Sequence, residues 1–311
     1  MPADPMKRHV RLRDLDTLLA VVQAGGMRKA ALQLHLSQPA VSKAVRSLEE
    51  ALGVSLLERG KRGVEPTKFG LALTHRTMAA FDELRQAVRD IEHLADPQGG
   101  ELRFGAMETM NAGVVATVVE RMSRTYARVR FHMQPGNSRH LIDHFLHERS
   151  IEFAVVRPAS MPLPTGTVGE KLFVDQFLVV VSAEHRHAKR RRITLAELTD
   201  ESWITSDPEA DAQSPLGRAF EAAGVEMPIP RLRSDSINLR LRLLATGRWV
   251  TLMPRSVLHF MPRSSLLRAL PIELPTWEVP NMIVTNRDRV LSPLAQTFLT
   301  TLREVAQSIN R

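Results

Sequence analysis

The sequence predicts a multidomain α+β protein with an N-terminal winged helix-turn-helix, a long linker helix and a C-terminal α/β region long enough for two lobes. Three observations lead to this prediction. Two short helical segments joined by a tight turn precede a basic hairpin, a long helical pattern without proline follows, and strand and helix patterns then alternate. The expected domains are residues 1–66, 67–96 and 97–311.

The composition limits the functional classes. The 311-residue chain is long enough for two or three packed domains, and its net charge of +8 favours an anionic partner such as nucleic acid. The absence of cysteine excludes disulfides, thiolate catalysis and cysteine-based zinc sites. The N-terminus lacks the apolar core of a secretory signal, and the longest apolar run, at 177–182, is too short to span a bilayer. We therefore expect a cytoplasmic protein with no membrane partner.

Residues 12–53 predict three helices. The first runs from Leu12 to a Gly25-Gly26 break, and a short second one covers about 28–35. Ser37 is the expected N-cap of the third helix, Pro39 lies in its first turn, and Gly53 ends it. This is the order of elements in a helix-turn-helix.

The third helix has two contrasting faces. At about 100° per residue, apolar side chains gather on one face and hydrogen-bonding or cationic side chains on the other. Such a polar face also suits an ordinary solvated surface helix, but in a helix-turn-helix it is the face that enters the major groove. Arg46 is suited to guanine and Gln38 to adenine. The apolar set is Val41, Val45, Leu48 and Leu52, and the polar set is Gln38, Ser42, Lys43 and Arg46.

Residues 55–70 predict a basic wing that contacts DNA. Two short extended pieces flank a turn from Gly60 to Gly63, which contains Lys61 and Arg62. Residues 7–68 hold 12 Lys and Arg against 6 Asp and Glu, so six of the eight net positive charges lie in this part of the chain. The flanking wing and this charge favour DNA binding over a merely solvated surface.

A long amphipathic helix is expected from residue 67 to about 96. Its apolar positions recur mostly at three- and four-residue steps, which is typical of a coiled-coil-like seam. Pairing with a second copy is favoured, and packing against its own chain is the alternative. The apolar positions are Leu71, Met78, Phe81, Leu84, Val88, Ile91 and Leu94.

Strands and helices alternate after the linker at 96–100. Strand candidates are ELRFGAM, RVRFHMQ, IEFAVVRP, FLVVVS and WVTLMP, and helices are expected at about 112–126 and 138–149. This alternation is typical of an α/β region with parallel strands.

The N-terminal motifs resemble those of the LysR-type transcriptional regulators. The resemblance runs without a gap from about residue 12 to 70, through AA-x-x-L, S-Q-P-A-V-S-K, L-E-x-x-L-G-V-x-L-x-E-R and T-x-x-G. One departure is GGMRKAA, where Met27 and Arg28 replace the usual cap of the second helix. The remaining chain resembles the family's periplasmic-binding-protein-like effector domain, with lobes expected at about 101–162 plus 268–311 and at about 163–267.

The resemblance implies a regulator that binds DNA and a small-molecule effector and is not an enzyme. It implies double-stranded DNA with an interrupted palindrome, RNA polymerase and a homotetramer built as a dimer of dimers, with no cofactor. The expected DNA contacts are Ser37, Gln38, Pro39, Ser42, Lys43, Arg46, Arg59, Lys61 and Arg62.

The effector is expected where strands end and helices begin, because helix N-termini and strand ends form ligand sites in α/β folds. Relatives place inducer contacts in equivalent loops, and the alternative is that these residues are only helix caps. An acid at Glu108 would repel a carboxylate effector unless it were paired, for example with Arg157. The expected contacts are Glu108, Thr109, Asn137, Arg157, Thr205 and Ser206.

Three alternatives are less favoured. His140, His144 and His147 lie on one helical face and could chelate a metal, but exposed histidines need no such role. The run from His185 to Arg192 could form a second nucleic-acid patch, but a solvated loop between the lobes is preferred. A ligand-binding protein or enzyme with N-terminal helices that only oligomerise would not explain where the basic charge lies.

Overall fold

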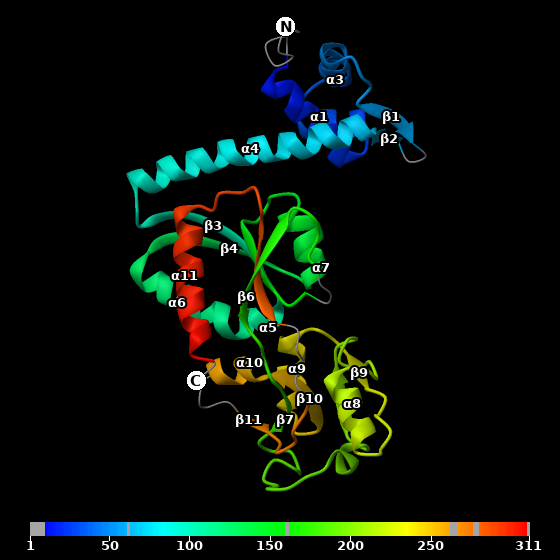
Figure 1. The fold of residues 1–311 in the computed structure, drawn as a ribbon, viewed down its shortest axis with the longest axis vertical. Helices are drawn as coiled ribbons and strands as arrows, with labels where there is room; N and C mark the ends of the chain where they lie inside the picture. The colour runs from blue at the N-terminus through cyan, green and yellow to red at the C-terminus, as the bar shows by residue number, and fades with distance from the viewer. Residues whose placement is uncertain (1–9, 61–62, 159–161, 262–265, 276–279, 310–311) are drawn as a thin grey trace. The chain divides into compact units, whose positions relative to one another are not determined.

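The computed structural model describes residues 10–60, 63–158, 162–261, 266–275 and 280–309. The chain divides into two compact units, Met1–Val88 and Arg89–Arg311. Figure 1 follows the chain through both. In the described residues no helix is long and apolar enough to cross a membrane.

The first unit begins with three helices and a hairpin, as the sequence predicts. Its apolar core joins all of these elements and includes Leu18, Val41, Val45, Leu48 and Leu56. The elements are α1 (Leu12–Ala24), α2 (Met27–Gln33), α3 (Gln38–Leu52), β1 (Leu57–Gly60) and β2 (Gly63–Pro66).

Two glycines end α1 and α3. Gly25 (φ 66°) and Gly53 (φ 71°) adopt the left-handed conformation that terminates α1 and α3. The turn between α2 and α3 instead uses His35, with a φ of 53°.

A 28-residue helix, α4 (Lys68–Ala95), follows the hairpin. The hydroxyl of Thr67 accepts a hydrogen bond from the Gly70 N–H (3.1 Å) and donates one to the Ser55 carbonyl (2.7 Å), which fixes the start of the helix. Gly70 is required here, because a Cβ at this position would lie 2.0 Å from the Leu56 carbonyl oxygen.

The second unit contains two mixed sheets. The first has the order β4-β3-β5-β12-β6 and the second the order β11-β7-β10-β8-β9. The expected parallel pairing holds for β3 with β4 and β5 and for β8 with β9 and β10, whereas β12 and β7 pair antiparallel with their neighbours. The strands are β3 (Gly99–Ala106), β4 (Arg128–Pro135), β5 (Phe153–Val156), β6 (Thr167–Phe173), β7 (Phe177–Ser182), β8 (Ser202–Thr205), β9 (Leu232–Arg233), β10 (Trp249–Pro254), β11 (Leu267–Ala269) and β12 (Asn281–Asn286).

Helices cover both sheets (Figure 1). Those after β3 and β4 contain π-helical stretches, η2 and η3, and the helix after β3 continues without a break to Thr125. The helices are α5 (Glu108–Met110), η2 (Asn111–Val115), α6 (Ala116–Thr125), α7 (Ser138–His140), η3 (Leu141–Leu146), η4 (Leu195–Leu198), α8 (Pro215–Ala222), α9 (Ile237–Leu244), α10 (Arg255–Phe260) and α11 (Pro293–Gln307).

The sheets correct the expected lobe boundaries. β6 pairs with β12 of the first sheet, although the sequence assigned residues 163–267 to the second lobe. β11 pairs with β7 of the second sheet, and the second lobe therefore extends to Ala269. The sequence could not predict these lobe boundaries, because strand pairing depends on hydrogen bonds between segments that are distant in the chain. The chain passes between the sheets from Phe173 to Phe177 and returns after Ala269.

Candidate nucleic-acid interface and interlobe site

The structure gives α3 the two faces expected of a recognition helix. Val41, Val45 and Leu48 are buried on one side, whereas Gln38, Lys43 and Arg46 are exposed and Ser42 is half-buried. Lys43 and Arg46 form no ion pair with any described acid. The polar face is therefore open to an external anion.

The N-terminus of α3 has the predicted cap. The hydroxyl of Ser37 accepts a hydrogen bond from the Ala40 N–H at 3.3 Å, and Pro39 lies in the first turn. Ser37, Gln38 and Pro39 are all exposed, so the start of the helix is accessible to a large partner.

The wing is an antiparallel hairpin in which Gly60 lies opposite Gly63. Arg59 belongs to β1, while the predicted contacts Lys61 and Arg62 lie outside the described residues. The Val64 N–H donates a 3.4 Å hydrogen bond to the Gly25 carbonyl, which attaches the hairpin to the turn between α1 and α2.

Glu108 and Thr109 begin the helix that follows β3. The Glu108 carboxylate accepts hydrogen bonds from the Ser236 hydroxyl (3.4 Å) and the Asn238 N–H (3.5 Å) at the start of α9. These donors come from α9, and Arg157, which the sequence suggested as a partner for Glu108, is not among them. The Thr109 hydroxyl is buried and has no hydrogen-bond partner among the described residues.

Arg157 follows β5, with its guanidinium 4.7 Å from the centre of the Phe177 ring. Burial lowers the pKa of Arg157, and the charges of Asp175 and Glu209 partly offset this effect. Burial also raises the pKa of Asp175, although hydrogen bonds from the hydroxyl and N–H of Ser256 act in the opposite direction. Asp175, in the crossover between the sheets, and Glu209, in the second lobe, thus both act on the pKa of Arg157.

Asn137 caps the helix that follows β4. Its side-chain carbonyl accepts a 2.9 Å hydrogen bond from the His140 N–H, as expected of a helix cap. The neighbouring Ser138 is buried and donates a 2.6 Å hydrogen bond to the Arg157 carbonyl. This bond joins the predicted loop to the residue after β5.

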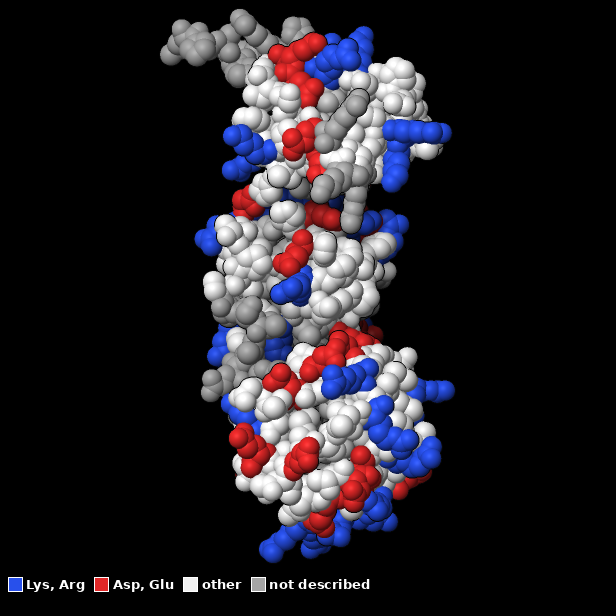
Figure 2. Space-filling model, turned by 90° about the vertical axis from the view of Figure 1, so that its right-hand side faces the viewer, with Lys and Arg blue, Asp and Glu red and all other residues white. Residues whose placement is uncertain are grey.

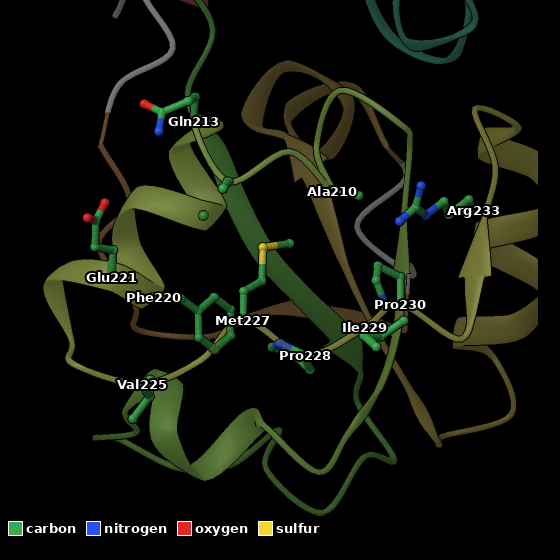
Figure 3. Close-up of a pocket in the computed structure, with 12 residues that line it drawn as sticks. Ala210, Gln213, Phe220, Glu221, Val225, Met227, Pro228, Ile229, Pro230 and Arg233 are labelled. Carbon is green, nitrogen blue, oxygen red and sulfur yellow. The ribbon is translucent and has the colours of Figure 1, made fainter.

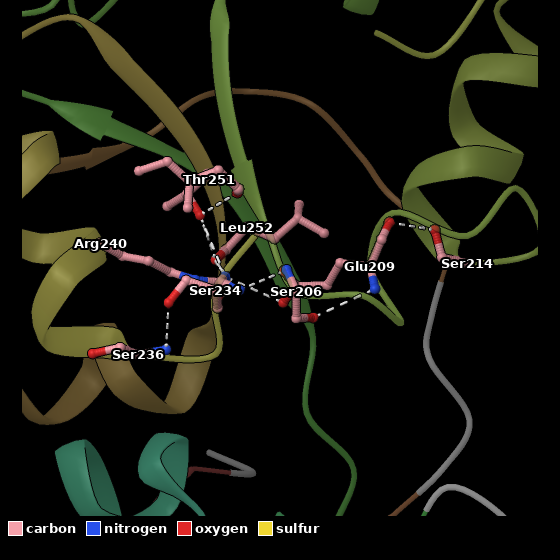
Figure 4. Close-up of polar contacts among 9 residues, drawn as sticks. Ser206, Glu209, Ser214, Ser234, Ser236, Arg240, Thr251 and Leu252 are labelled. Atoms are coloured by element: carbon pink, nitrogen blue, oxygen red, sulfur yellow. Dashed lines mark hydrogen bonds and ion pairs between the residues drawn. The ribbon is translucent and has the colours of Figure 1, made fainter. Parts of the chain in front are cut away.

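Thr205 is the last residue of β8. Ser206 follows it and lies beside a buried ion pair (Figure 4). The Ser206 N–H donates to Glu209 (2.6 Å), and Arg240 pairs with the same carboxylate at 2.8 Å. Arg240 also donates to the carbonyls of Ser234 (2.7 Å) and Leu252 (3.0 Å). The arrangement fixes the loop after β8 to α9 and β10.

Thr205 differs from its surroundings, since it is fully buried and its hydroxyl has no partner among the described residues. A buried unsatisfied hydroxyl is costly unless a bound ligand supplies its hydrogen bond.

The sequence did not single out Glu209, Arg240 or Asp175, because their partners are far away in the chain.

A separate hollow of about 520 Å³ lies in the second lobe between α8 and the segment before β9 (Figure 3). None of the six predicted effector residues lines it. Its walls are mainly apolar and include Phe220, Val225, Met227, Pro228, Ile229 and Pro230.

The sequence suggested that the basic run from His185 to Arg192 is a loop between the lobes, and this prediction is wrong. The run follows β7 within the second lobe, where Arg186 pairs with Glu201 at 2.7 Å. His185 is buried and lies 3.5 Å from the same carboxylate. Burial lowers the pKa of His185. Figure 2 likewise shows acids interspersed with the cations of this unit.

The predicted histidine face carries exposed His140 and His144, whose ring centres are 5.0 Å apart. Among the described residues, no group of three or more potential ligands is arranged to hold a metal.

Comparisons with known proteins agree with this architecture. A family model described as "Bacterial regulatory helix-turn-helix protein, lysR family" matches residues 12–71, and one described as "LysR substrate binding domain" matches residues 95–307. The chain is similar to the HTH-type transcriptional regulator GbpR of Azospirillum brasilense, with 25% identity over 97% of this chain and 89% of that protein.

Solved structures have the same fold. Full-length CbnR in complex with its target DNA has a TM-score of 0.60 and 20% identity, covering 96% of this chain and 100% of that one. Full-length LysG from Corynebacterium glutamicum, with bound effector Arg, has a TM-score of 0.63 and 17% identity, covering 96% and 99%. The substrate-binding-domain model alone spans more than half of the chain, which therefore belongs to the LysR family of transcriptional regulators, with a DNA-binding domain and an effector-binding domain rather than an enzyme site.

Proposed function

We propose that the polar face of α3 reads an interrupted palindrome in DNA. The observation that carries this proposal is the exposed set Gln38, Lys43 and Arg46 opposite the buried face of the same helix. Arg46 is suited to contact guanine, and Ser42 and Lys43 suit base edges or phosphates. The wing, with Arg59, Lys61 and Arg62, follows the adjacent backbone or enters the minor groove.

The two DNA half-sites require two copies of the chain, and α4 is the proposed dimer element. Its apolar side chains Leu84, Val88 and Ile91 are 49%, 56% and 66% exposed in the single chain. Phe81 instead packs against the core of the first unit, so part of the predicted seam serves its own chain. A dimer of dimers, working in the cytoplasm where it meets DNA and RNA polymerase, completes the proposed assembly.

The proposed effector site lies where the lobes meet, at Glu108, Thr109, Asn137, Arg157, Thr205 and Ser206. Two observations support a common location for these groups. Glu108 contacts Ser236, and the charge of Glu209 acts on the pKa of Arg157. The buried hydroxyls of Thr109 and Thr205 supply hydrogen-bonding groups for a polar ligand. Such a ligand changes DNA bending and polymerase contact only if it binds one quaternary arrangement better than the other.

Replacing Arg46 with alanine is expected to reduce discrimination at the contacted base pair by about 1–3 kcal/mol. Affinity for the selected DNA should fall, while affinity for random duplex changes little. Binding of both duplexes by wild type, Arg46→Ala and the exposed-cation control Arg191→Ala measures this difference. Equal weakening on both duplexes would make Arg46 a phosphate contact instead.

Replacing Thr205 with valine tests the effector site. Valine keeps the shape of threonine and removes the unsatisfied hydroxyl. The free energy of unfolding should therefore rise by about 1 kcal/mol. DNA affinity should be unchanged, but compounds that raise the melting temperature of the wild-type protein should lose this effect. The exposed variant Thr246→Val is the control. Equal responses in all three proteins would remove Thr205 from the site.

A further inference from the structure

Buried polar atoms without hydrogen-bond partners gather at the ends of strands that face the other lobe. Among the described residues eight buried side-chain atoms have no partner, and five of them belong to Thr109, Asn111, Thr205 and Asn281. Thr205 and Asn281 are 0% exposed, and neither end of the Asn281 amide is used. Folded proteins leave few such atoms unsatisfied, so a group of them indicates a missing partner.

Three of these residues lie at one edge of the first sheet. β3, β5 and β12 are neighbours, and β12 runs antiparallel to the other two strands. Thr109 and Asn111 follow the end of β3, and Asn281 is the first residue of β12, so all three lie at the same edge. The Asn111 amide donates a 3.2 Å hydrogen bond to the Ala106 carbonyl, which fixes its side chain at the end of β3.

A series of hydrogen bonds connects this edge to Thr205 in the second lobe. Glu108, which precedes Thr109, accepts a hydrogen bond from the Ser236 hydroxyl at 3.4 Å. The Ser236 N–H donates to the Ser234 hydroxyl (3.1 Å), and the Ser234 N–H donates to the Thr205 carbonyl (2.8 Å). The unsatisfied atoms of the two lobes therefore belong to one connected region.

The buried and half-buried charges of this region interact with groups of the chain itself. Arg240 pairs with Glu209 at 2.8 Å (Figure 4). The charges of Asp175 and Glu209 act on Arg157. Glu108 accepts its hydrogen bonds at the N-terminal end of α9, which favours negative charge. The groups that still need a partner are therefore neutral hydroxyls and amides.

We propose that the effector is an uncharged compound with several hydroxyl or amide groups, bound by the unsatisfied atoms of Thr109, Asn111, Thr205 and Asn281. This assignment names the ligand class of the effector site and rests on the proposed function. A hydroxyl group both donates and accepts, so a polyol can satisfy the two threonines and both ends of the Asn281 amide. A carboxylate or ammonium group would be buried there without a counter-charge. Because the unsatisfied atoms are buried, the lobes must separate to admit the ligand.

The test uses the full-length protein and two series of six-carbon probes. One series is glucitol, gluconate and glucamine, and the other is mannitol, mannonate and mannamine. Within a series only one terminal group differs, as a hydroxymethyl, a carboxylate or an ammonium group. Melting temperatures measured at rising probe concentrations give each Kd. At least one neutral probe should bind with a Kd about ten-fold or more below those of its charged counterparts.

Two substitutions of Asn281 test its contact with the ligand. Asn281→Leu removes both unsatisfied amide groups, so the protein should stay folded and lose the response to the neutral probe. Asn281→Asp introduces a negative charge at nearly constant shape and should shift the preference to the ammonium member of the same series.

The matched control is Asn286→Leu, at the other end of β12. The Asn286 amide is also buried, but it donates a 2.7 Å hydrogen bond to the Leu146 carbonyl. This substitution should lower the melting temperature of the free protein and keep the response to the neutral probe.

The outcomes separate the ligand class from the site. A neutral probe that is preferred by the wild type, lost in Asn281→Leu and kept in Asn286→Leu supports the proposal. Preference for a charged member, or no binding of any neutral probe, overturns it. If the preferred charged member loses its effect in Thr205→Val, the effector site itself stands. A probe that binds wild type, Asn281→Leu and Thr205→Val equally overturns both the ligand class and the proposed site.

Discussion

Replacing Arg240 with methionine is expected to destabilise the second lobe by about 3–5 kcal/mol. The substitution leaves the Glu209 carboxylate buried without its cation, and the carbonyls of Ser234 and Leu252 lose a donor. Removing one partner of a buried pair is costly because the remaining charge stays in a low-dielectric environment. The fluorescence of buried Trp203 during urea unfolding reports the change.

Arg242→Met is the matched control, because Arg242 lies on the same helix with an exposed side chain. It should unfold near the urea concentration of the wild type. The double variant Glu209→Leu/Arg240→Met should recover much of the lost stability, since no unpaired charge remains. Coincident unfolding of Arg240→Met and Arg242→Met would contradict the role assigned to the pair.

Replacing Leu84 with aspartate is expected to shift the protein from dimers to monomers in the absence of DNA. A charge in the middle of an apolar interface must be desolvated, so pairing through α4 is lost. Affinity for a duplex with two half-sites should then fall by about 10²–10⁴-fold, toward that of a single half-site, because the two domains no longer act together. Sedimentation and DNA titration measure the two effects.

Leu84→Met keeps an apolar side chain at the same position and should leave assembly and DNA binding intact. If Leu84→Asp sediments like the wild type and binds the full site equally well, α4 is not the dimer element. Loss of binding without a change in assembly would point instead to a defect in the DNA-binding unit.

The DNA-binding unit could be predicted almost completely because its signals are local. The Ser37 cap, the Gly25 and Gly53 terminators and the apolar face of α3 are all within a few residues of the features that they determine. The predicted wing contacts Lys61 and Arg62 lie outside the described residues.

The effector domain was predicted less completely because its decisive contacts are distant in the chain. Glu209 and Arg240 are 31 residues apart, and Asp175 and Ser256 are 81 residues apart. Buried charges resemble surface residues in a hydropathy pattern, so nothing local marked these pairs. Similarly, the β6–β12 pairing joins segments about a hundred residues apart and determined the true lobe boundary.

Four of the predicted effector residues fall into two groups. Asn137 serves as a helix cap, and Glu108 contacts the start of α9, so both have a structural use within the chain. Thr109 and Thr205 have buried hydroxyls without described partners. The sequence placed these residues in loops at strand ends but could not separate these roles, which depend on the tertiary surroundings of each side chain.

Selection of bound duplexes from a random DNA library, at two salt concentrations, tests the central claim most directly. We expect enrichment of an interrupted palindrome, with weaker retention at the higher salt concentration because phosphate contacts release counterions. Absence of DNA retention at the lower salt concentration would contradict the proposed recognition of DNA by α3 and the wing.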